Sequence, residues 1–252
     1  MAEIVSFAGQ KGGTGKSMLA QAFALEAVLK GRNTVLADLD VGQRTSFEWS
    51  EARMRNELMP HVQVVVVDPS KHESDFGVQH LTKQTDIVVV DAPGWSDEKT
   101  KLLAGYSDLM ILPTGASLAD MRPTIRLMHE LIAKGIQKNQ ICTALCRVKS
   151  AGEIKFARDY IKQAGYQTLP GMLRDMPTYR SLQNEGKAAI EADAKTMKSE
   201  ARELISSIHA NLEKIRSRSH DKPERFELQP ERFVLEGTKQ KEKKTQEKRR
   251  RR

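Results

Sequence analysis

Cysteines are scarce in this sequence, and their scarcity narrows what the protein can be. The 252 residues contain two, Cys142 and Cys146, which are too few for a disulfide-stapled domain. We place both on one strand, where residues four apart face the same side about 13 Å apart, too far for a disulfide. No other Cys or His pair complements them as metal ligands, so we predict that both are small buried side chains.

Long apolar runs are also missing, and none approaches the roughly 18 residues that a membrane span needs. The N-terminus lacks the charged and then apolar layout of a signal peptide, because the run Ile4–Ala8 is too short. With 39% hydrophobic residues, the chain can nevertheless bury a core. We therefore predict a cytoplasmic protein that has no integral membrane association.

Basic charge is concentrated at one end of the chain. The net charge is +8, and the last fourteen residues hold nine Lys or Arg and two Glu, which gives +7. The rest of the chain carries 32 basic and 31 acidic groups and is nearly neutral. Residues 217–252 combine dense charge with few apolar side chains, so we predict a domain over residues 1–216 followed by a flexible basic tail. A basic tip favours polyanions, either nucleic acid or an anionic membrane surface.

Residues 1–216 alternate between short apolar runs, often β-branched, and helix-like stretches. The predicted strands are Ile4–Ala8, Thr34–Ala37, Val62–Val67, Ile87–Val90, Leu109–Leu112 and Ile141–Val148. The predicted helices are Ser17–Lys30, Ser46–Leu58, Asp97–Ala104, Leu118–Lys134, Glu153–Ala164, Leu182–Glu191 and Ala194–Arg216. The four valines of Val64–Val67 favour a strand that is covered on both faces. The alternation is typical of an α/β fold with a mostly parallel, twisted sheet and helices on both faces.

The last predicted helix has one apolar stripe. Its apolar residues recur at spacings of three and four, which places them on one side of a helix. They are Met197, Ala201, Leu204, Ile205, Ile208 and Leu212. We expect this stripe to dock on the sheet domain.

A glycine-rich loop joins the first predicted strand to the first predicted helix, and it reads Gly9-Gln10-Lys11-Gly12-Gly13-Thr14-Gly15-Lys16-Ser17. Glycines let backbone N–H groups turn inward around a phosphate, and the helix N-terminus adds its own free N–H groups. Lys16 can reach the β- and γ-phosphates, and the Ser17 hydroxyl can bind Mg²⁺. This context predicts a P-loop NTPase with ATP and Mg²⁺ as cofactors. The expected nucleotide-binding set in the loop is Gly12, Gly13, Thr14, Gly15, Lys16, Ser17 and Met18.

The loop departs from the strict P-loop pattern at Gln10, where a glycine is expected five residues before Gly15. The variant K-G-G-x-G-K-[ST] fits at every position, and with Lys11 ahead of the double glycine it resembles the deviant Walker A ATPases of the ParA/MinD family. In that family this lysine reaches across a nucleotide-sandwich dimer to the partner's phosphates. The resemblance implies a homodimer in the ATP state, in which Lys11 offsets charge that develops during phosphoryl transfer. Lys11 has no evident use inside its own subunit.

Carboxylates follow two of the predicted strands. Asp38 and Asp40 come after Thr34–Ala37, at the sheet edge where α/β folds bind ligands. They resemble the family's D-x-D segment, which implies that Asp40 positions or activates the attacking water near the Mg²⁺ shell, with Asp38 in support. Asp91, after Ile87–Val90, resembles Walker B and is expected to hold Mg²⁺ through water. The expected catalytic residues are thus Lys11, Lys16 and Asp40, and the expected metal residues are Ser17, Asp40 and Asp91.

The resemblance covers about residues 3–212 and extends to the nucleotide base. The stretch Arg174–Arg180 resembles the family segment that lines the adenine. Met176 and Pro177 are therefore expected to contact the base.

The resemblance also implies a function in DNA partition. Such an ATPase dimerises on ATP, binds DNA non-specifically and hydrolyses ATP to segregate or position plasmid or chromosomal DNA, stimulated by a centromere-binding or other partner protein. It would then be nucleoid-associated. Non-specific binding needs Lys and Arg near phosphates and weakens steeply with salt. The candidates are Lys198, Arg202, Lys214, Arg216 and Arg218 on the last helix and the arginines 249–252, although a solvated helix face and a solubilising tail stay open as readings.

Two alternatives use the same nucleotide chemistry. The first is a MinD-like positioning ATPase at the membrane, which Val41-Gly42-Gln43-Arg44 somewhat favours because it looks closer to that branch. That branch ends in a short amphipathic helix, whereas residues 240–249 have no apolar face. The second is a ParA-like ATPase for another cargo or for conjugative DNA transfer.

Overall fold

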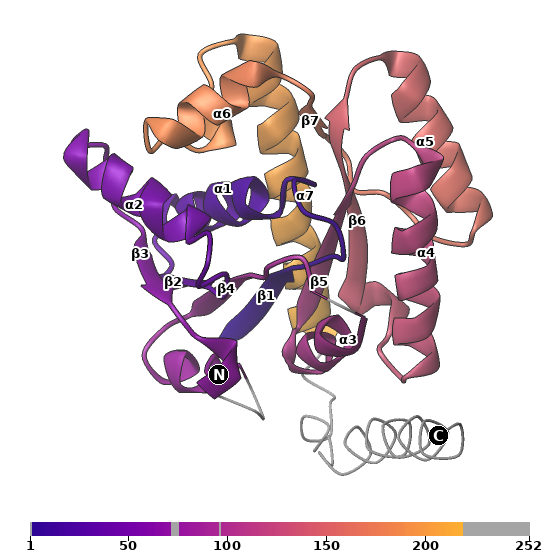
Figure 1. Ribbon diagram of the computed structural model, residues 1–252, viewed down its shortest axis with the longest axis horizontal. Coiled ribbons are helices and arrows are strands. Elements are labelled where there is room, and N and C mark those ends of the chain that lie inside the picture. The colour runs from indigo at the N-terminus through magenta and orange to yellow at the C-terminus, as the bar shows by residue number, and fades with distance from the viewer. Residues whose placement is uncertain (1, 72–75, 96, 219–252) are drawn as a thin grey trace, which may run out of the picture. The chain divides into compact units, whose positions relative to one another are not determined.

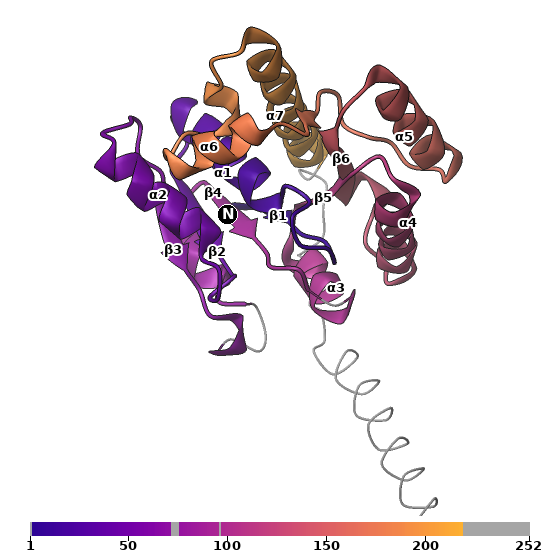
Figure 2. The same cartoon turned by 45° about the horizontal axis from the view of Figure 1, so that its top comes forward.

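The computed structural model describes residues 2–71, 76–95 and 97–218 (Figure 1). The predicted basic tail, from residue 219 onward, lies outside the described residues. Within them, the strands of the sheet are β1 (Glu3–Phe7), β2 (Thr34–Asp38), β3 (Gln63–Val66), β4 (Ile87–Asp91), β5 (Leu109–Thr114), β6 (Ile141–Val148) and β7 (Leu173–Arg174). Their order is β3-β2-β4-β1-β5-β6-β7, and every neighbouring pair is parallel. Figure 2 shows this order from β3 on the left to β6 on the right.

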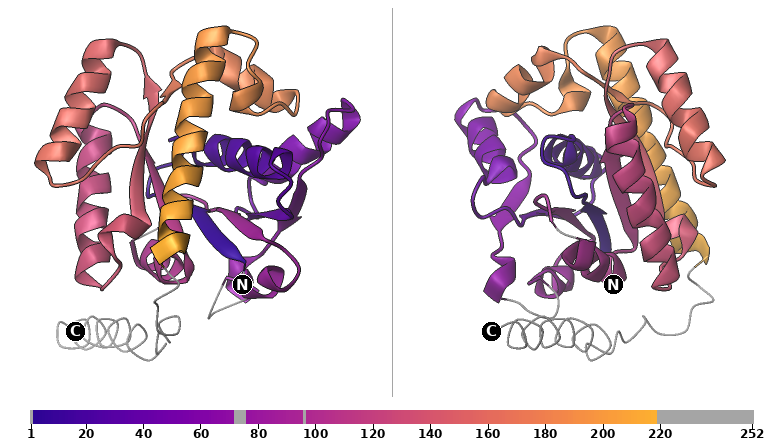
Figure 3. Two further views of the ribbon diagram at one scale, coloured as in Figure 1. Left: turned by 180° about the vertical axis from the view of Figure 1, so that it is seen from behind. Right: turned by 45° about the vertical axis from the view of Figure 1, so that its right-hand side comes forward.

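Helices cover both faces of the sheet, as the alternating pattern predicts. The described helices are α1 (Lys16–Leu29), α2 (Thr45–Arg55), α3 (Asp97–Tyr106), α4 (Leu118–Ala133), α5 (Ala151–Gln163), α6 (Pro177–Asn184) and α7 (Lys195–Arg218). Apolar residues of α1 and α7 form one core with the sheet, and those of α3, α4 and α5 form a second core on the opposite face (Figure 3). The sheet is therefore the middle layer of three.

The central strands are apolar at nearly every position because both of their faces are covered. Along β4, Ile87 and Val89 belong to the α1 core, whereas Val88 and Val90 belong to the α3–α5 core. All four are fully buried. Each such side chain stabilises the fold by about 1.5–3 kcal/mol, so the strand that ends at Asp91 is firmly held.

The prediction for the four valines Val64–Val67 was wrong in one respect. Val64 packs against one core and Val65 against the other, yet both stay partly exposed. The reason is that β3 is the edge strand of the sheet, with no neighbour beyond it among the described residues. A run of valines thus indicates two contacted faces but does not distinguish an edge strand from a central one.

The C-terminal part confirms one expectation and corrects another. The predicted apolar stripe of α7 is buried throughout, from Met197 to Leu212. The predicted helix Leu182–Glu191, however, is wrong, because α6 begins at Pro177 and a separate short 3-10 turn spans Ala189–Glu191. Proline at the first position favours a helix start. Gly186, at φ 76°, ends the helix, because a left-handed residue closes a helix C-terminus.

No helix among the described residues is long and apolar enough to cross a membrane.

Sheet register brings the motif residues to one edge. Phe7, the last residue of β1, pairs with Asp91 of β4, and Asp38 of β2 pairs with Asp91 from the other side. The glycine-rich loop leaves β1 at this same edge and enters α1 at Lys16. Three separate sequence motifs therefore meet around the carboxyl end of β4, where parallel α/β sheets bind ligands.

Candidate active site

The phosphate loop, residues 9–15, is fixed by close packing from two sides. Gly15 has φ 98°, and a Cβ built there would lie 3.2 Å from the Sγ of Cys146 on β6. A Cβ on Gly94, just after β4, would lie 3.2 Å from the carbonyl oxygen of Gln10. Burial raises the pKa of Cys146 to about 12, so it stays a neutral thiol. Both cysteines are free, as predicted, and Cys146 is a small buried support for the loop. The prediction that both are buried was wrong for Cys142, which is partly exposed.

Lys16 lies inside the loop. It is buried, and its Nζ donates to the carbonyl oxygen of Lys11 over 2.8 Å. Burial lowers the pKa of Lys16, while the charges of Asp91 and Asp40 act in the opposite direction. An ammonium group held this way has one neutral acceptor and two nearby carboxylates, which leaves it able to bind a phosphate.

Asp91, like Asp38, is a buried acid of the site. One oxygen, Oδ2, accepts a hydrogen bond from the Ser46 hydroxyl over 2.7 Å, whereas Oδ1 has no hydrogen-bond partner among the described residues. Burial and the adjacent Asp38 carboxylate raise the pKa of Asp91 to about 7, against the hydroxyls of Ser46 and Ser17 and the charge of Lys16. A buried carboxylate oxygen that has no hydrogen-bond partner among the described residues fits a bound cation.

Asp38 and Asp40 perform different tasks. Asp38 is fully buried, and its two oxygens accept backbone N–H groups of Asp40, Ser46 and Phe47 over 2.9–3.1 Å. It therefore caps the N-terminus of α2, which has no cap from its own N-cap residue. Burial raises the pKa of Asp38, although these hydrogen bonds act in the opposite direction.

Asp40 is half-buried, and its Oδ1 accepts hydrogen bonds from the N–H groups of Gly42 and Gln43. These two hydrogen bonds hold the Asp40 side chain in place within the turn after β2.

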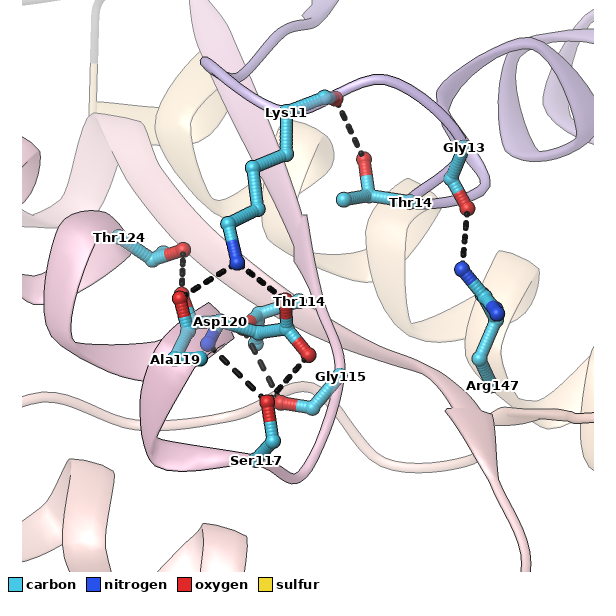
Figure 4. Close-up of polar contacts among 10 residues, drawn as sticks. All are labelled: Lys11, Gly13, Thr14, Thr114, Gly115, Ser117, Ala119, Asp120, Thr124 and Arg147. Carbon is cyan, nitrogen blue, oxygen red and sulfur yellow. Dashed lines mark hydrogen bonds and ion pairs between the residues drawn. The ribbon is translucent and has the colours of Figure 1, made fainter.

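The Lys11 side chain leaves the loop toward Ala119 and Asp120 (Figure 4). Its Nζ donates to the carbonyl oxygen of Ala119 over 2.6 Å and to Asp120 Oδ1 over 2.8 Å. The expectation that Lys11 has no use inside its own subunit was therefore wrong. Burial alone would raise the pKa of Asp120, but hydrogen bonds from Lys11 and Ser117 outweigh it and hold that pKa below its usual range. The Lys11 side chain remains 44% exposed.

Asp120 and Arg147 also contact the loop, although no sequence motif marks them. Asp120 lies in the first turn of α4, where Ser117 caps the helix, so its S-x-x-D pattern resembles an ordinary helix start. Arg147, at φ 55°, donates to the carbonyl oxygen of Gly13 over 3.4 Å (Figure 4). Its positive φ is uncommon for a residue with a side chain. Only the folded structure brings either residue to the loop.

The expected base contacts lie beyond the end of β7. Met176 is the N-cap residue of α6 and is 42% exposed, and Pro177 is the first residue of that helix. The chain before them is held by Asp175, whose N–H donates to the carbonyl oxygen of Val148 over 3.0 Å. Their contact with a base stays a prediction.

The basic residues of α7 do not form one cluster. Lys198 is half-buried and Arg202 exposed near the α6 end, whereas Lys214 and Arg216 are exposed near the other end. Sixteen residues separate Lys198 from Lys214, which corresponds to about 24 Å along a helix. Figure 3 shows α7 extending from α6 to the opposite end of the domain. The side chain of Arg218 lies outside the described part of the chain.

One known protein family matches the part of the chain that contains the site. The model of the family described as ATPase MipZ matches residues 3–127, which contain the loop, Asp40, Asp91 and Asp120. No curated protein sequence matches the chain.

Solved structures share the fold. The cell division ATPase MinD of Pyrococcus furiosus is 16% identical with a TM-score of 0.66, over 83% of this chain and 99% of that one. MinD of Pyrococcus horikoshii, in complex with Mg-ADP, is 16% identical with a TM-score of 0.65, over 82% and 96%. A putative plasmid partition protein of Borrelia burgdorferi, bound to AMPPNP, is 16% identical with a TM-score of 0.63, over 83% and 99%. These structures show that the fold is shared. The match to the MipZ family model, together with the lysine-first loop, leads to one conclusion: the chain belongs to the ParA/MinD family of deviant Walker A ATPases.

Proposed function

We propose that this chain is a positioning ATPase that binds Mg-ATP, closes into a homodimer in the ATP state and then binds DNA without sequence preference. A centromere-binding or other partner protein stimulates hydrolysis, and the cycle segregates or positions plasmid or chromosomal DNA. One observation carries the proposal: the phosphate loop and the helix that it enters carry two lysines in different settings, with Lys16, the first residue of α1, buried and Lys11, in the loop, exposed. A nucleotide bound in one subunit would contact Lys16 and would leave Lys11 facing outward.

Lys16, Ser17 and Asp91 are the proposed holders of Mg-ATP. Lys16 would exchange the neutral carbonyl oxygen of Lys11 for phosphate oxygens, which are stronger acceptors because they are charged. Ser17 would bind the metal through its hydroxyl, and Asp91, whose Oδ1 has no partner among the described residues, would hold it through water. When bound, Mg²⁺ offsets phosphate charge and acts as a Lewis acid. Met176 and Pro177 are the proposed base contacts.

Lys11 is the proposed link between the two subunits. Its ion pair with Asp120 is exposed, with side chains 44% and 31% accessible, and pairs of this kind contribute about 0–1 kcal/mol. Lys11 can therefore leave Asp120 at little cost and reach the phosphates of a partner subunit. Asp40 lies half-buried beside Lys16, where we propose that it orients the attacking water.

DNA binding is proposed for the basic residues of α7, where Lys198 and Arg202 lie at one end and Lys214 and Arg216 at the other. In a non-specific complex each phosphate contact adds about 0.9 to the slope of log affinity against log salt. The separation of the two groups allows their contributions to be measured separately.

An ATP-dependent DNA-binding assay tests the proposal. With a non-hydrolysable ATP analogue, we expect tight binding to an arbitrary duplex that weakens steeply with salt, and weak binding with ADP. Replacing Lys198 and Arg202, or Lys214 and Arg216, by alanine should lower the salt slope by about one to two units. Lys162→Ala, an exposed lysine of α5 on the opposite face, is the matched control and should change nothing. Equal binding with ATP and ADP would contradict the proposed cycle.

A further inference from the structure

A chain of hydrogen bonds crosses the α1 side of the domain and ends at Asp91. Gln183 of α6 donates its Nε2–H to Gln21 Oε1 over 2.9 Å. Gln21 of α1 donates its own Nε2–H to the Ser46 hydroxyl over 3.3 Å. Ser46, at the start of α2, donates that hydroxyl proton to Asp91 Oδ2 over 2.7 Å. Four residues from four different elements thus form one continuous path.

Burial makes this chain costly to leave incomplete. Gln21 and Ser46 are fully buried and Asp91 is 2% exposed, so water cannot replace a lost partner easily. An unsatisfied buried polar group costs about 1–3 kcal/mol. Every donor in the chain points the same way, toward the carboxylate, and aligned hydrogen bonds polarise and strengthen one another. The arrangement is therefore suited to hold the Asp91 carboxylate in one orientation.

The Ser46 hydroxyl is itself held on two sides. The backbone N–H of Ser46 donates to Asp38 Oδ2 over 2.9 Å, and Asp38 pairs with Asp91 in the sheet. Gln21 fixes the hydroxyl from the helix side and also reaches the carbonyl oxygen of Thr45 over 3.5 Å. With Oδ2 of Asp91 occupied from this direction, Oδ1 is the oxygen left without a partner among the described residues.

We propose that Ser46 and Gln21 are positioning residues for Asp91: the Ser46 hydroxyl, held by Gln21, occupies Oδ2 and so leaves Oδ1 to face the magnesium ion and its water. Through Gln183, the same chain ties this metal-binding carboxylate to α6, the helix that begins at the proposed base contact Pro177. The proposal rests on the proposed binding of Mg-ATP and adds residues that no motif of the sequence marks. Partners of this kind, one bond removed from the metal, typically change metal affinity 10–100-fold when they are removed.

The test measures how much magnesium strengthens nucleotide binding. A fluorescent ATP analogue is titrated into each variant with Mg²⁺ and with EDTA, and the ratio of the two affinities is the readout. Ser46→Ala should lower this ratio about tenfold while leaving the affinity in EDTA unchanged. Gln21→Met, which keeps the volume but removes both amide hydrogen bonds, should lower the ratio about threefold, because it acts on Asp91 only through Ser46.

Ser50→Ala is the matched control. Ser50 is also a buried serine of α2, but its hydroxyl donates to the carbonyl oxygen of Phe47 rather than to Asp91. It should keep the full magnesium ratio, and thermal unfolding should show that all three variants are folded. An undiminished ratio in both Ser46→Ala and Gln21→Met would overturn the inference, as would an equal loss in Ser50→Ala. A natural chain with no magnesium enhancement at all would instead overturn the proposed function.

Discussion

The inner wall and the outer rim of the phosphate loop are built on different principles. The inner wall, formed by Lys16, Asp38, Ser46 and Asp91, is buried, and short hydrogen bonds join Ser46 to both aspartates. The outer rim, formed by Lys11, Asp120 and Arg147, is largely exposed and held by ion pairs and a long hydrogen bond.

Buried polar groups are expensive to disturb, whereas exposed ion pairs exchange partners easily. The inner wall is thus suited to hold a nucleotide in one fixed geometry. The outer rim is suited to change partners when a second subunit arrives. The two lysines can serve these two tasks because Lys16 is buried whereas Lys11 is exposed and paired with Asp120.

Replacing Lys16 should produce the largest loss, because it removes a cation from the inner wall. Lys16→Ala is expected to weaken ATP binding by roughly 5 kcal/mol, several thousand-fold, which is the upper range for truncating one partner of a buried charge pair. Isothermal titration calorimetry with ATP and Mg²⁺ measures this directly. ATP affinity within about threefold of the natural chain would contradict the assignment of the loop.

Replacing Asp91 should change the pH dependence of stability. The pKa of Asp91 is raised from 3.8 to about 7, so without magnesium the folded protein keeps this proton between those pH values while the unfolded chain loses it. Stability should therefore fall as pH rises from about 4 to about 7. Asp91→Asn removes this penalty, which is about 4 kcal/mol at pH 8 and about 2 kcal/mol at pH 5.

Urea unfolding in EDTA at pH 5 and pH 8 checks this result. Asp159→Asn, an exposed acid of α5, is the control and should show no such dependence on pH. If Asp91→Asn changed stability equally at both pH values, the inner wall would not hold Asp91 as described.

Replacing Asp120 should have the smallest effect, because it acts on the rim. Asp120→Asn removes an exposed ion pair and is expected to change the free energy of unfolding by less than about 1 kcal/mol. It also frees Lys11, so ATP-dependent dimerisation should become a few-fold tighter. Sedimentation equilibrium with a non-hydrolysable ATP analogue measures the dimer. A dimer weakened by this change, with Asp159→Asn unaffected, would show that Asp120 does not restrain Lys11.

Contiguous features of the site were predictable from the sequence. The strand, the glycine-rich loop and the helix that follow one another around Lys16 are local, and each glycine or lysine has a fixed place in the pattern. Asp91 was predictable for a similar reason, because an apolar strand that ends in an acid has a simple periodicity. The same reasoning identified the buried stripe of α7.

The rest of the site depends on contacts between distant residues. Asp120 lies 109 positions after Lys11, and Gln183 lies 162 positions after Gln21. No local pattern marks these pairs, because each residue alone resembles an ordinary helix residue. Lys11 shows the consequence: its place in the loop was predicted, whereas its partner in its own subunit was not. The boundaries of α6 were missed because Pro177 and Gly186, which start and end it, were not used.

The central claim is that ATP closes a dimer through Lys11 while Lys16 holds the nucleotide. The most direct measurement is the mass of Lys11→Ala in solution, by light scattering, with Mg²⁺ and a non-hydrolysable ATP analogue at concentrations that saturate binding. We predict that the natural chain is a dimer under these conditions and that Lys11→Ala binds the analogue with nearly normal affinity but stays a monomer. A Lys11→Ala protein that binds the analogue and forms the same dimer would contradict the account.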